Sequence, residues 1–227
     1  AQSWALAMLK QRMLQMMMIA FFISLSELIY FRHVFGSDSL EGCEHSVFEI
    51  VSNSVDEARE GYGTDIIVTK FKDLSIQVED FGRGVPLGYN EKEGRWNWEL
   101  VFCELYAGGK YSNDDDNAAY EYSLGTNGLG ATATQYSSEF MTVQSYNGVT
   151  LSEIDFKHGE VNSKLRVSDI KPGEKKRGTI IRWRPDLDVF TDINIPLEYF
   201  SDVLKRQAVV NAGITFKLNY HKDDGEV

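Results

Sequence analysis

The sequence predicts an α+β fold, a two-layer sandwich in which a mixed, mainly antiparallel sheet is covered on one face by helices. Three observations support this class. Apolar residues recur at helical spacing over residues 43 to 61, two alternating runs follow as a hairpin, and strands dominate the second half of the chain. Helices that come early and strands that come late are typical of an α+β sandwich.

Composition limits the possible functions. The chain has 227 residues, of which 43% are hydrophobic, so it can bury a substantial core in one large or two small domains. Its net charge of -11 repels phosphate backbones, which argues against a DNA-binding face on this stretch. Two cysteines provide neither a disulfide framework nor metal-ligand spacing, so we expect free thiols in the cytoplasm, a reducing compartment.

The N-terminal segment differs from the rest of the chain. Residues 13 to 25 form an apolar run that is shorter than the roughly 20 residues of a membrane span, and no small-residue cleavage site of a signal peptide follows it. We therefore expect an arm or a packed helix and no membrane partner. The predicted division is an atypical segment over residues 1 to 31 and one domain over residues 32 to 227.

The first predicted helix, residues 43 to 61, carries a polar stripe beside its apolar one. His45, Glu49, Asn53 and Asp56 fall at i, i+4, i+8 and i+11 of this helix. A carboxylate can accept a proton from water, and an amide oxygen is a neutral ligand suited to Mg²⁺. A solvated helix face explains the same stripe, so the helix alone does not establish a site.

A hairpin follows, with strands over residues 64 to 71 and 74 to 80. Asp80 ends the second strand, and Gly82 and Gly84 come directly after it. A carboxylate beside glycines that let a flat ring approach can accept a hydrogen bond from an exocyclic amine. An ordinary Asp-Gly turn is the alternative interpretation.

A second helix, predicted over residues 96 to 106, leads into a long glycine-, asparagine- and aspartate-rich stretch over residues 107 to 130. Loops of this length in compact domains are usually functional. Gly125, Gly128 and Gly130 precede a helix N-terminus, where backbone N–H groups favour phosphates. The pattern is neither the P-loop nor the dinucleotide fingerprint.

The remaining elements complete the sheet and its helix layer. They are a helix over residues 131 to 137, strands over 139 to 146, 149 to 156 and 178 to 185, a helix over 196 to 213 and a strand over 214 to 220. An Asn147-Gly148 dipeptide marks a hairpin turn between the first two of these strands.

Taken in order, these motifs resemble the GHKL, or Bergerat, ATPase fold. Within that fold, the residue sequences of these motifs are similar to those of the ATPase domain of bacterial gyrase B subunits and their topoisomerase IV counterparts. The segments that carry the resemblance are HSVFEIVSNSVDEA, EDFGRGVP, ELYAGGKY, GTNGLGATATQYSS, RGTIIRWRPDLDVFT and LKRQAVVNAG, and the resemblance as a whole covers about residues 34 to 220.

The resemblance implies a role for each motif. Glu49 is the expected general base that activates water against the γ-phosphate, with His45 orienting it, and Asn53 is the expected Mg²⁺ ligand. Asp80 is expected to accept the adenine amino group, and Thr179 to assist through a water. The residues expected at ATP are Asn53, Asp56, Glu57, Asp80, Gly82, Arg83, Gly84, Val85, Pro86, Lys110, Tyr120, Gly125, Thr126, Asn127, Gly128, Leu129, Gly130 and Thr179.

Two positions depart from the family pattern. Ser52 stands where an Asp usually precedes the magnesium-binding Asn, and Asn127 stands where the phosphate loop often has a His. Asn127 keeps a hydrogen-bonding side chain but lacks an imidazole.

The function implied by the resemblance is the ATP-binding and hydrolysing N-terminal domain of a type II DNA topoisomerase, whose ATP-driven dimerisation gates strand passage. The expected ligands are ATP or ADP, Mg²⁺ and ATP-competitive inhibitors. The expected partners are a second copy of the full-length subunit and a DNA-cleaving, gyrase A-like subunit, with DNA bound only by the full complex. Two alternatives stay open: a sensor-kinase-like phosphotransfer module and a nucleotide-binding regulator without catalysis.

Overall fold

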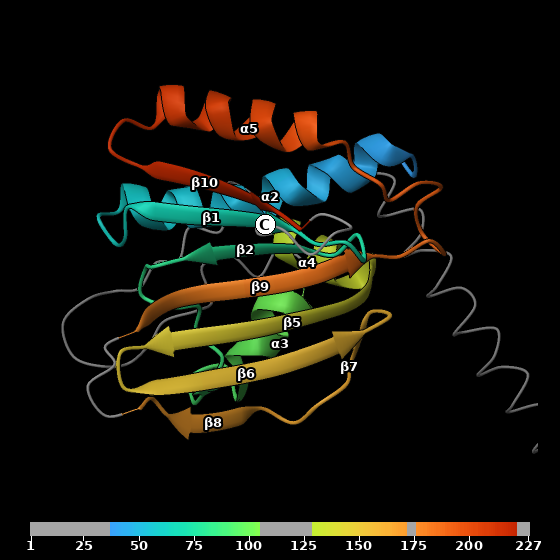
Figure 1. The fold of residues 1–227 in the computed structure, drawn as a ribbon. Helices are drawn as coiled ribbons and strands as arrows, with labels where there is room; N and C mark the ends of the chain where they lie inside the picture. Colours follow the sequence, from blue (N-terminus) through green and yellow to red (C-terminus); the bar gives the residue numbers. More distant parts are fainter. Residues whose placement is uncertain (1–36, 105–128, 172–175, 222–227) are drawn as a thin grey trace, which may run out of the picture.

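A computed structural model describes residues 37–104, 129–171 and 176–221. Figure 1 shows one large twisted sheet with helices behind it. The predicted N-terminal segment, residues 1 to 31, lies outside the described residues, as does most of the glycine-rich stretch.

The described chain contains four helices and ten strands. They are α2 (Leu40–Arg59), β1 (Asp65–Lys70), β2 (Ile76–Asp80), β3 (Tyr89–Asn90), β4 (Arg95–Trp96), α3 (Asn97–Phe102), α4 (Gly130–Tyr136), β5 (Ser138–Asn147), β6 (Thr150–Lys157), β7 (Glu160–Val161), β8 (Arg166–Asp169), β9 (Arg177–Pro185), α5 (Leu197–Val210) and β10 (Thr215–Tyr220).

Eight of the strands form a single sheet. The order is β10-β1-β2-β9-β5-β6-β7, with β8 also paired to β6. The β1–β10 pair is parallel, while every other pair in this sheet is antiparallel. The strands β3 and β4 form a separate two-stranded ribbon. The predicted fold class, a mixed and mainly antiparallel sheet with helices on one face, is confirmed.

The helices form one layer. In Figure 1, α2, α3 and α4 lie behind the sheet, and α5 runs along the edge strand β10. The Tyr199 hydroxyl of α5 donates a hydrogen bond of 2.7 Å to the Glu44 carbonyl of α2, which joins α5 to the same layer. No helix in the described segments is long and apolar enough to cross a membrane.

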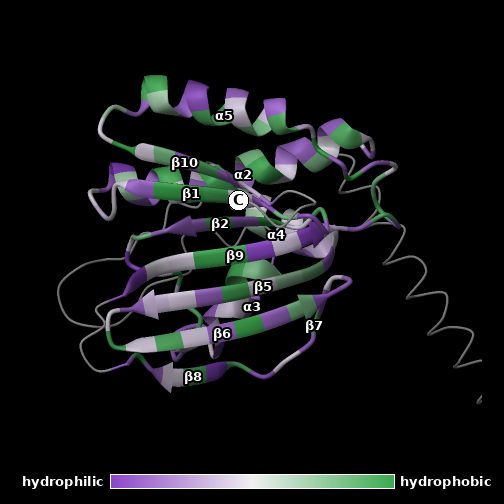
Figure 2. Ribbon diagram, in the orientation of Figure 1, coloured by the Kyte–Doolittle hydropathy of each residue, from purple (hydrophilic) through white to green (hydrophobic). Residues whose placement is uncertain are grey.

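The core lies between the two layers. Along β5, β6 and β9, hydrophobic residues alternate with hydrophilic ones (Figure 2), and Met141, Ile154 and Trp183 are fully buried. Val47 and Val51 of α2 face them. Each fully buried aliphatic side chain contributes roughly 1.5–3 kcal/mol to folding, so the apolar stripe of α2 holds that helix against the sheet.

Most of the predicted helices and strands are present in the structure, but several begin or end at other residues than predicted. The helix α2 begins earlier than predicted, since the Ser39 hydroxyl accepts a hydrogen bond from the Glu41 N–H as an N-cap. The helix α3 ends at Phe102 rather than at residue 106, and α5 ends at Val210 rather than at residue 213. The strands β7 and β8 were not predicted because all of their residues are exposed and show no buried alternation.

One glycine allows β9 to approach β2. Gly178 has φ +118°, and a Cβ atom placed there would lie 2.0 Å from the carbonyl oxygen of Asp80. Any other residue at this position would therefore push the start of β9 away from the end of β2. The next residue, Thr179, could not then reach the Asp80 side chain.

We expect Gly178→Ala to lower the free energy of unfolding by roughly 2–5 kcal/mol, because it adds both a positive-φ strain and a steric overlap. Urea denaturation followed by circular dichroism measures this. Gly88→Ala is the matched control, since no atom lies within 4 Å of a Cβ built there. Equal stability of the two variants would contradict the assigned role of Gly178.

Candidate nucleotide site

Asp80 lies at the end of β2 and is 8% exposed. Its Oδ1 atom accepts hydrogen bonds of 3.0 Å from the backbone N–H groups of Gly82 and Thr179. The Ser54 hydroxyl of α2 donates to Oδ2 at 3.2 Å. The loop after β2, the strand β9 and the helix α2 therefore converge on a single carboxylate.

Burial raises the pKa of Asp80 to about 6, and the nearby Glu57 carboxylate adds to the rise. The hydrogen bonds from Gly82, Thr179 and Ser54 oppose this effect by stabilising the ionised form. A carboxylate that is ionised at neutral pH and has two of its donors on one oxygen can still accept a further donor at the other. An exocyclic amine is such a donor.

Glu57 and Arg83 form one wall of this site. The Arg83 guanidinium donates two hydrogen bonds of 2.8 Å to the two Glu57 oxygens, and the Arg83 backbone N–H adds a third of 2.8 Å. Arg83 also pairs with Glu60 and lies 3.8 Å over the ring of Tyr62. Gly82 has no room for a side chain, since a Cβ there would lie 2.3 Å from Cγ of Glu57.

The loop after Gly82 is held by the neighbouring strands. The Val85 N–H donates to the Thr179 hydroxyl at 3.0 Å, and the Ser145 hydroxyl of β5 donates to the Val85 carbonyl at 2.7 Å. Gly84 has φ +89°, and a Cβ there would meet the Tyr146 carbonyl oxygen at 2.7 Å. Val85 and Pro86 are buried beneath this loop. The loop is thus a rigid part of the fold.

Glu49 lies one turn away from His45 on α2, and its Oε1 lies 3.0 Å from Nε2 of His45. The start of α4 packs against the same carboxylate, because a Cβ at Gly130 would lie 2.1 Å from Oε2 of Glu49. Glu49 is partly exposed, with 28% of its side chain accessible. A carboxylate oriented by an imidazole and open on one side can take a proton from a water.

Asn53 is the residue that suits a magnesium ion. It is 9% exposed, and its side-chain amide makes no hydrogen bond to the described residues. Mg²⁺ keeps most of its water ligands and takes one or two protein oxygens, so a single amide is an adequate protein contribution. Within the described segments no group of three or more His, Cys, Asp or Glu residues could hold a metal ion, and such a group is not required here.

The structure brings together most of the predicted residues that it describes. Asp80 is hydrogen-bonded to Gly82 and Thr179, and Arg83, the residue after Gly82, is hydrogen-bonded to Glu57, so these five residues form one cluster. Asp56 is half-buried on α2, and Leu129 precedes α4. The predicted residues that lie outside the described segments are Lys110, Tyr120, Gly125, Thr126, Asn127 and Gly128.

Three residues of this cluster were not predicted from the sequence. Ser54 donates to Asp80, Ser145 holds the loop through Val85, and Tyr62 stacks under Arg83. Ser54 could have been noticed as a polar residue inside the apolar stripe of α2. Ser145 and Tyr62 carry no such signal, because only the sheet register and the turn after α2 bring them close.

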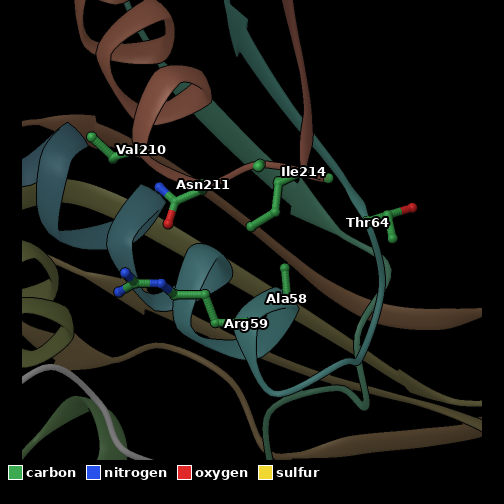
Figure 3. A pocket seen from close by; sticks show the side chains of 8 residues that line it. Ala58, Arg59, Thr64, Val210, Asn211 and Ile214 are labelled. Carbon is green, nitrogen blue, oxygen red and sulfur yellow. The ribbon is translucent and has the colours of Figure 1, made fainter.

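A separate pocket lies elsewhere in the fold. It has a volume of about 320 Å³ and is formed by the end of α2, the start of β1 and the α5–β10 connection (Figure 3). None of the predicted nucleotide residues lines it. A cavity on its own does not identify a binding or catalytic site. We therefore assign the candidate nucleotide site from the hydrogen-bonded residues around Asp80 and Glu49.

Known proteins resemble the chain over most of its length, although no profile of a protein family matches it. The B subunit of the type 2 topoisomerase of Aquifex aeolicus is 36% identical over 178 residues, which are 78% of this chain and 22% of the relative. The B subunit of DNA topoisomerase 4 of Mycoplasma capricolum is 36% identical over 185 residues, 81% of this chain and 28% of the relative. The chain belongs to the type II topoisomerase B subunits.

A solved structure identifies the region of the B subunit to which the chain corresponds. The 43K ATPase domain of Thermus thermophilus gyrase B, solved in complex with an aminocoumarin, is 28% identical with a TM-score of 0.69. The match covers 83% of this chain and 46% of that one. The chain is thus the ATPase region of a topoisomerase B subunit, and it spans between 22% and 29% of the length of the similar full sequences.

In this topoisomerase region, the raised pKa of Asp80 has a measurable effect on stability. A folded-state pKa of about 6 against an ordinary value of 3.8 means that the contribution of Asp80 is fully present below about pH 4 and is lost as the pH rises through 6. We expect Asp80→Asn to remove this loss, since the amide oxygen keeps the two backbone donors and the amide nitrogen can donate to the Ser54 hydroxyl.

The measurement is the free energy of unfolding of wild type and Asp80→Asn between pH 4 and pH 7.5. The difference, variant minus wild type, should rise by up to about 3 kcal/mol across this range, at 1.36 kcal/mol for each pKa unit. A difference that stays constant with pH would show that Asp80 has an ordinary pKa.

Proposed function

We propose that the chain binds ATP with Mg²⁺ and hydrolyses it, as the ATPase region of a type II topoisomerase. The observation that carries the proposal is Asp80. This carboxylate is buried and is held by Gly82 and Thr179 on one oxygen, and among the described residues only the Ser54 hydroxyl donates to the other. The arrangement suits the exocyclic amine of adenine, with Thr179 assisting through a water.

The rest of the pocket supports a flat ring. The glycines at positions 82 and 84 leave no side chain between the loop and its neighbours, while Val85 and Pro86 supply an apolar surface below it. The Arg83–Glu57 pair closes one wall. An inhibitor that competes with ATP would occupy the same surface.

The reacting end of the nucleotide would lie near Glu49. In this proposal, Glu49 removes the proton from the water that attacks the γ-phosphate, and His45 holds the carboxylate in position at 3.0 Å. Asn53 would bind the Mg²⁺ ion, which neutralises charge on the phosphates when bound. Leu129 and Gly130 begin α4 beside Glu49, and we place the phosphates there, held also by Lys110, Tyr120 and the glycine-rich residues before Leu129.

For the whole protein we propose ATP-driven self-association that gates the passage of one DNA duplex through another. A gyrase A-like subunit would cleave the DNA, and the complex would work in the cytoplasm. The ATPase domain would span residues 32 to 227, with residues 1 to 31 as an atypical segment.

The alternatives differ in what happens to the phosphate. A phosphotransfer module needs an acceptor histidine, and a regulator without catalysis has no use for a base. The His45–Glu49 pair of α2, whose glutamate packs against the start of α4, favours hydrolysis over both.

Asp80→Asn should weaken nucleotide binding by about 1.5–3 kcal/mol, as expected when a charged acceptor is removed. The amide introduced at position 80 has two possible orientations, and each places two donors opposite one another. With its oxygen toward the N–H groups of Gly82 and Thr179, its NH₂ group faces the adenine amine. With the amide flipped, its NH₂ group faces those two backbone N–H groups. Calorimetric titration with a magnesium complex of a non-hydrolysable ATP analogue and with ADP measures the loss. Equal affinity for both proteins would mean that Asp80 is only a turn residue.

Glu49→Ala should lower the ATP hydrolysis rate about 100-fold or more, which is the usual contribution of a general base, while it leaves nucleotide affinity within a few-fold. The assay uses a chain extended to the full length of the B subunit. Glu44→Ala, a partly exposed carboxylate of the same helix, is the matched control. Hydrolysis that survives Glu49→Ala would exclude Glu49 as the base.

A further inference from the structure

The pocket between α2 and α5 has the features of a binding site. Eight residues line its volume of about 320 Å³: Ala58, Arg59, Thr64, Val210, Asn211, Ala212, Gly213 and Ile214. They come from two stretches that are distant in sequence, residues 58 to 64 and residues 210 to 214, and Figure 3 shows Val210, Asn211 and Ile214 opposite Ala58 and Arg59. The volume is at the lower end of that found for ligand pockets, and it would hold one large apolar side chain.

Asn211 provides a polar group in the wall of this pocket. The residue is 6% exposed, and its Nδ2 atom donates to the Gln207 carbonyl oxygen at 2.9 Å and to the Gln207 Oε1 atom at 2.8 Å. These two bonds fix the orientation of the amide, and its Oδ1 atom has no hydrogen-bond partner within the described segments. A buried acceptor without a donor is unusual, so a ligand that supplies an N–H there would gain a hydrogen bond.

One arginine lines the pocket, and a second arginine and two valines lie on the last turns of α5. Arg59 lines the pocket, and Arg206 lies one helical turn before Val210 on α5. Neither arginine has an ion-pair partner within the described chain. Val209 and Val210 are 83% and 69% exposed, and this end of α5 is coloured as hydrophobic in Figure 2. Two exposed valines thus lie beside the two arginines at this end of α5.

We propose that this pocket binds an acidic peptide segment of a partner protein through one apolar anchor residue. The anchor side chain fills the hollow between Val210 and Ile214. Its backbone N–H donates to Oδ1 of Asn211, after a small movement of the exposed Arg59 side chain. The flanking carboxylates pair with Arg59 and Arg206.

A peptide fits these groups better than other anions do. The phosphate backbone of DNA would find two arginines but would leave the hollow beside Val210 and Ile214 and the Asn211 acceptor unused. A small inorganic anion would leave them unused as well. A peptide supplies an apolar side chain for the hollow, a backbone N–H for the Asn211 oxygen and carboxylates for the two arginines.

The site is separate from the nucleotide cluster, so the proposal does not depend on ATP binding. Its residues begin at Ala58 on α2, immediately after Glu57, and continue on α5. The same helix therefore contributes its middle to the nucleotide site and its end to the pocket.

The test uses the 227-residue chain and a fluorescein-labelled peptide, Asp-Glu-Leu-Asp-Glu, with fluorescence anisotropy as the readout. We expect saturable binding with a Kd below about 1 mM at low ionic strength, weakening as salt screens the ion pairs. The double variant Arg59→Gln, Arg206→Gln should raise the Kd at least 10-fold, and Val210→Ser should raise it several-fold. Lys157→Gln, an exposed cation at the end of β6, is the matched control and should bind as wild type does.

Two further peptides separate the possible outcomes. With Ser in place of the Leu anchor, or with Asn and Gln in place of the acids, binding should fall at least 5-fold. Binding that ignores the anchor, or that survives the double arginine variant, would overturn the proposal. Equal competition by duplex DNA would show a nucleic-acid surface instead, and concentration-dependent dimers lost in Val210→Ser would assign the patch to a second copy of the chain.

Discussion

The placement of the buried Asp80 carboxylate is the constraint on which the described site depends. A carboxylate removed from water is costly unless donors surround it, and here the donors come from α2, from the loop after β2 and from β9. These contacts exist only because β9 lies beside β2 in the sheet and because Gly178 allows the close approach. The carboxylate that would recognise the base therefore also fixes the relative positions of three elements.

The helix α2 connects the core with the site. Its apolar stripe packs on the sheet through residues such as Val47 and Val51, and its polar stripe carries Glu49 and Asn53. Since both stripes belong to one rigid helix, the packing of the core sets where the proposed base and metal ligand lie. The Glu57–Arg83 pair then joins the end of the helix to the loop after β2. A change in the core under α2 is thus expected to move catalytic groups as well as to lower stability.

Charge is distributed unevenly over the domain. The chain carries a net charge of -11, which argues against a DNA-binding face on this region. Arg59 and Arg206 depart from this pattern at the pocket beside α5, where exposed valines lie next to them. The combination has no role in the core and none in the nucleotide site, so a partner is the physical reason that remains for it.

The sequence by itself predicted the class of fold and the central helix, and both are confirmed, because helical and strand periodicities are local. The roles of Glu49, Asn53 and Asp80 come from the resemblance and stay predictions. The sequence also indicated the turn at Asn147-Gly148. Only the tertiary structure decided that the Ser54 hydroxyl and the backbone N–H of Thr179 donate directly to Asp80 and that Ser145 holds the loop, since these contacts follow from sheet register and helix packing. The short exposed strands β7 and β8 and the pocket at Asn211 depend on the same long-range pairing, which no local pattern encodes.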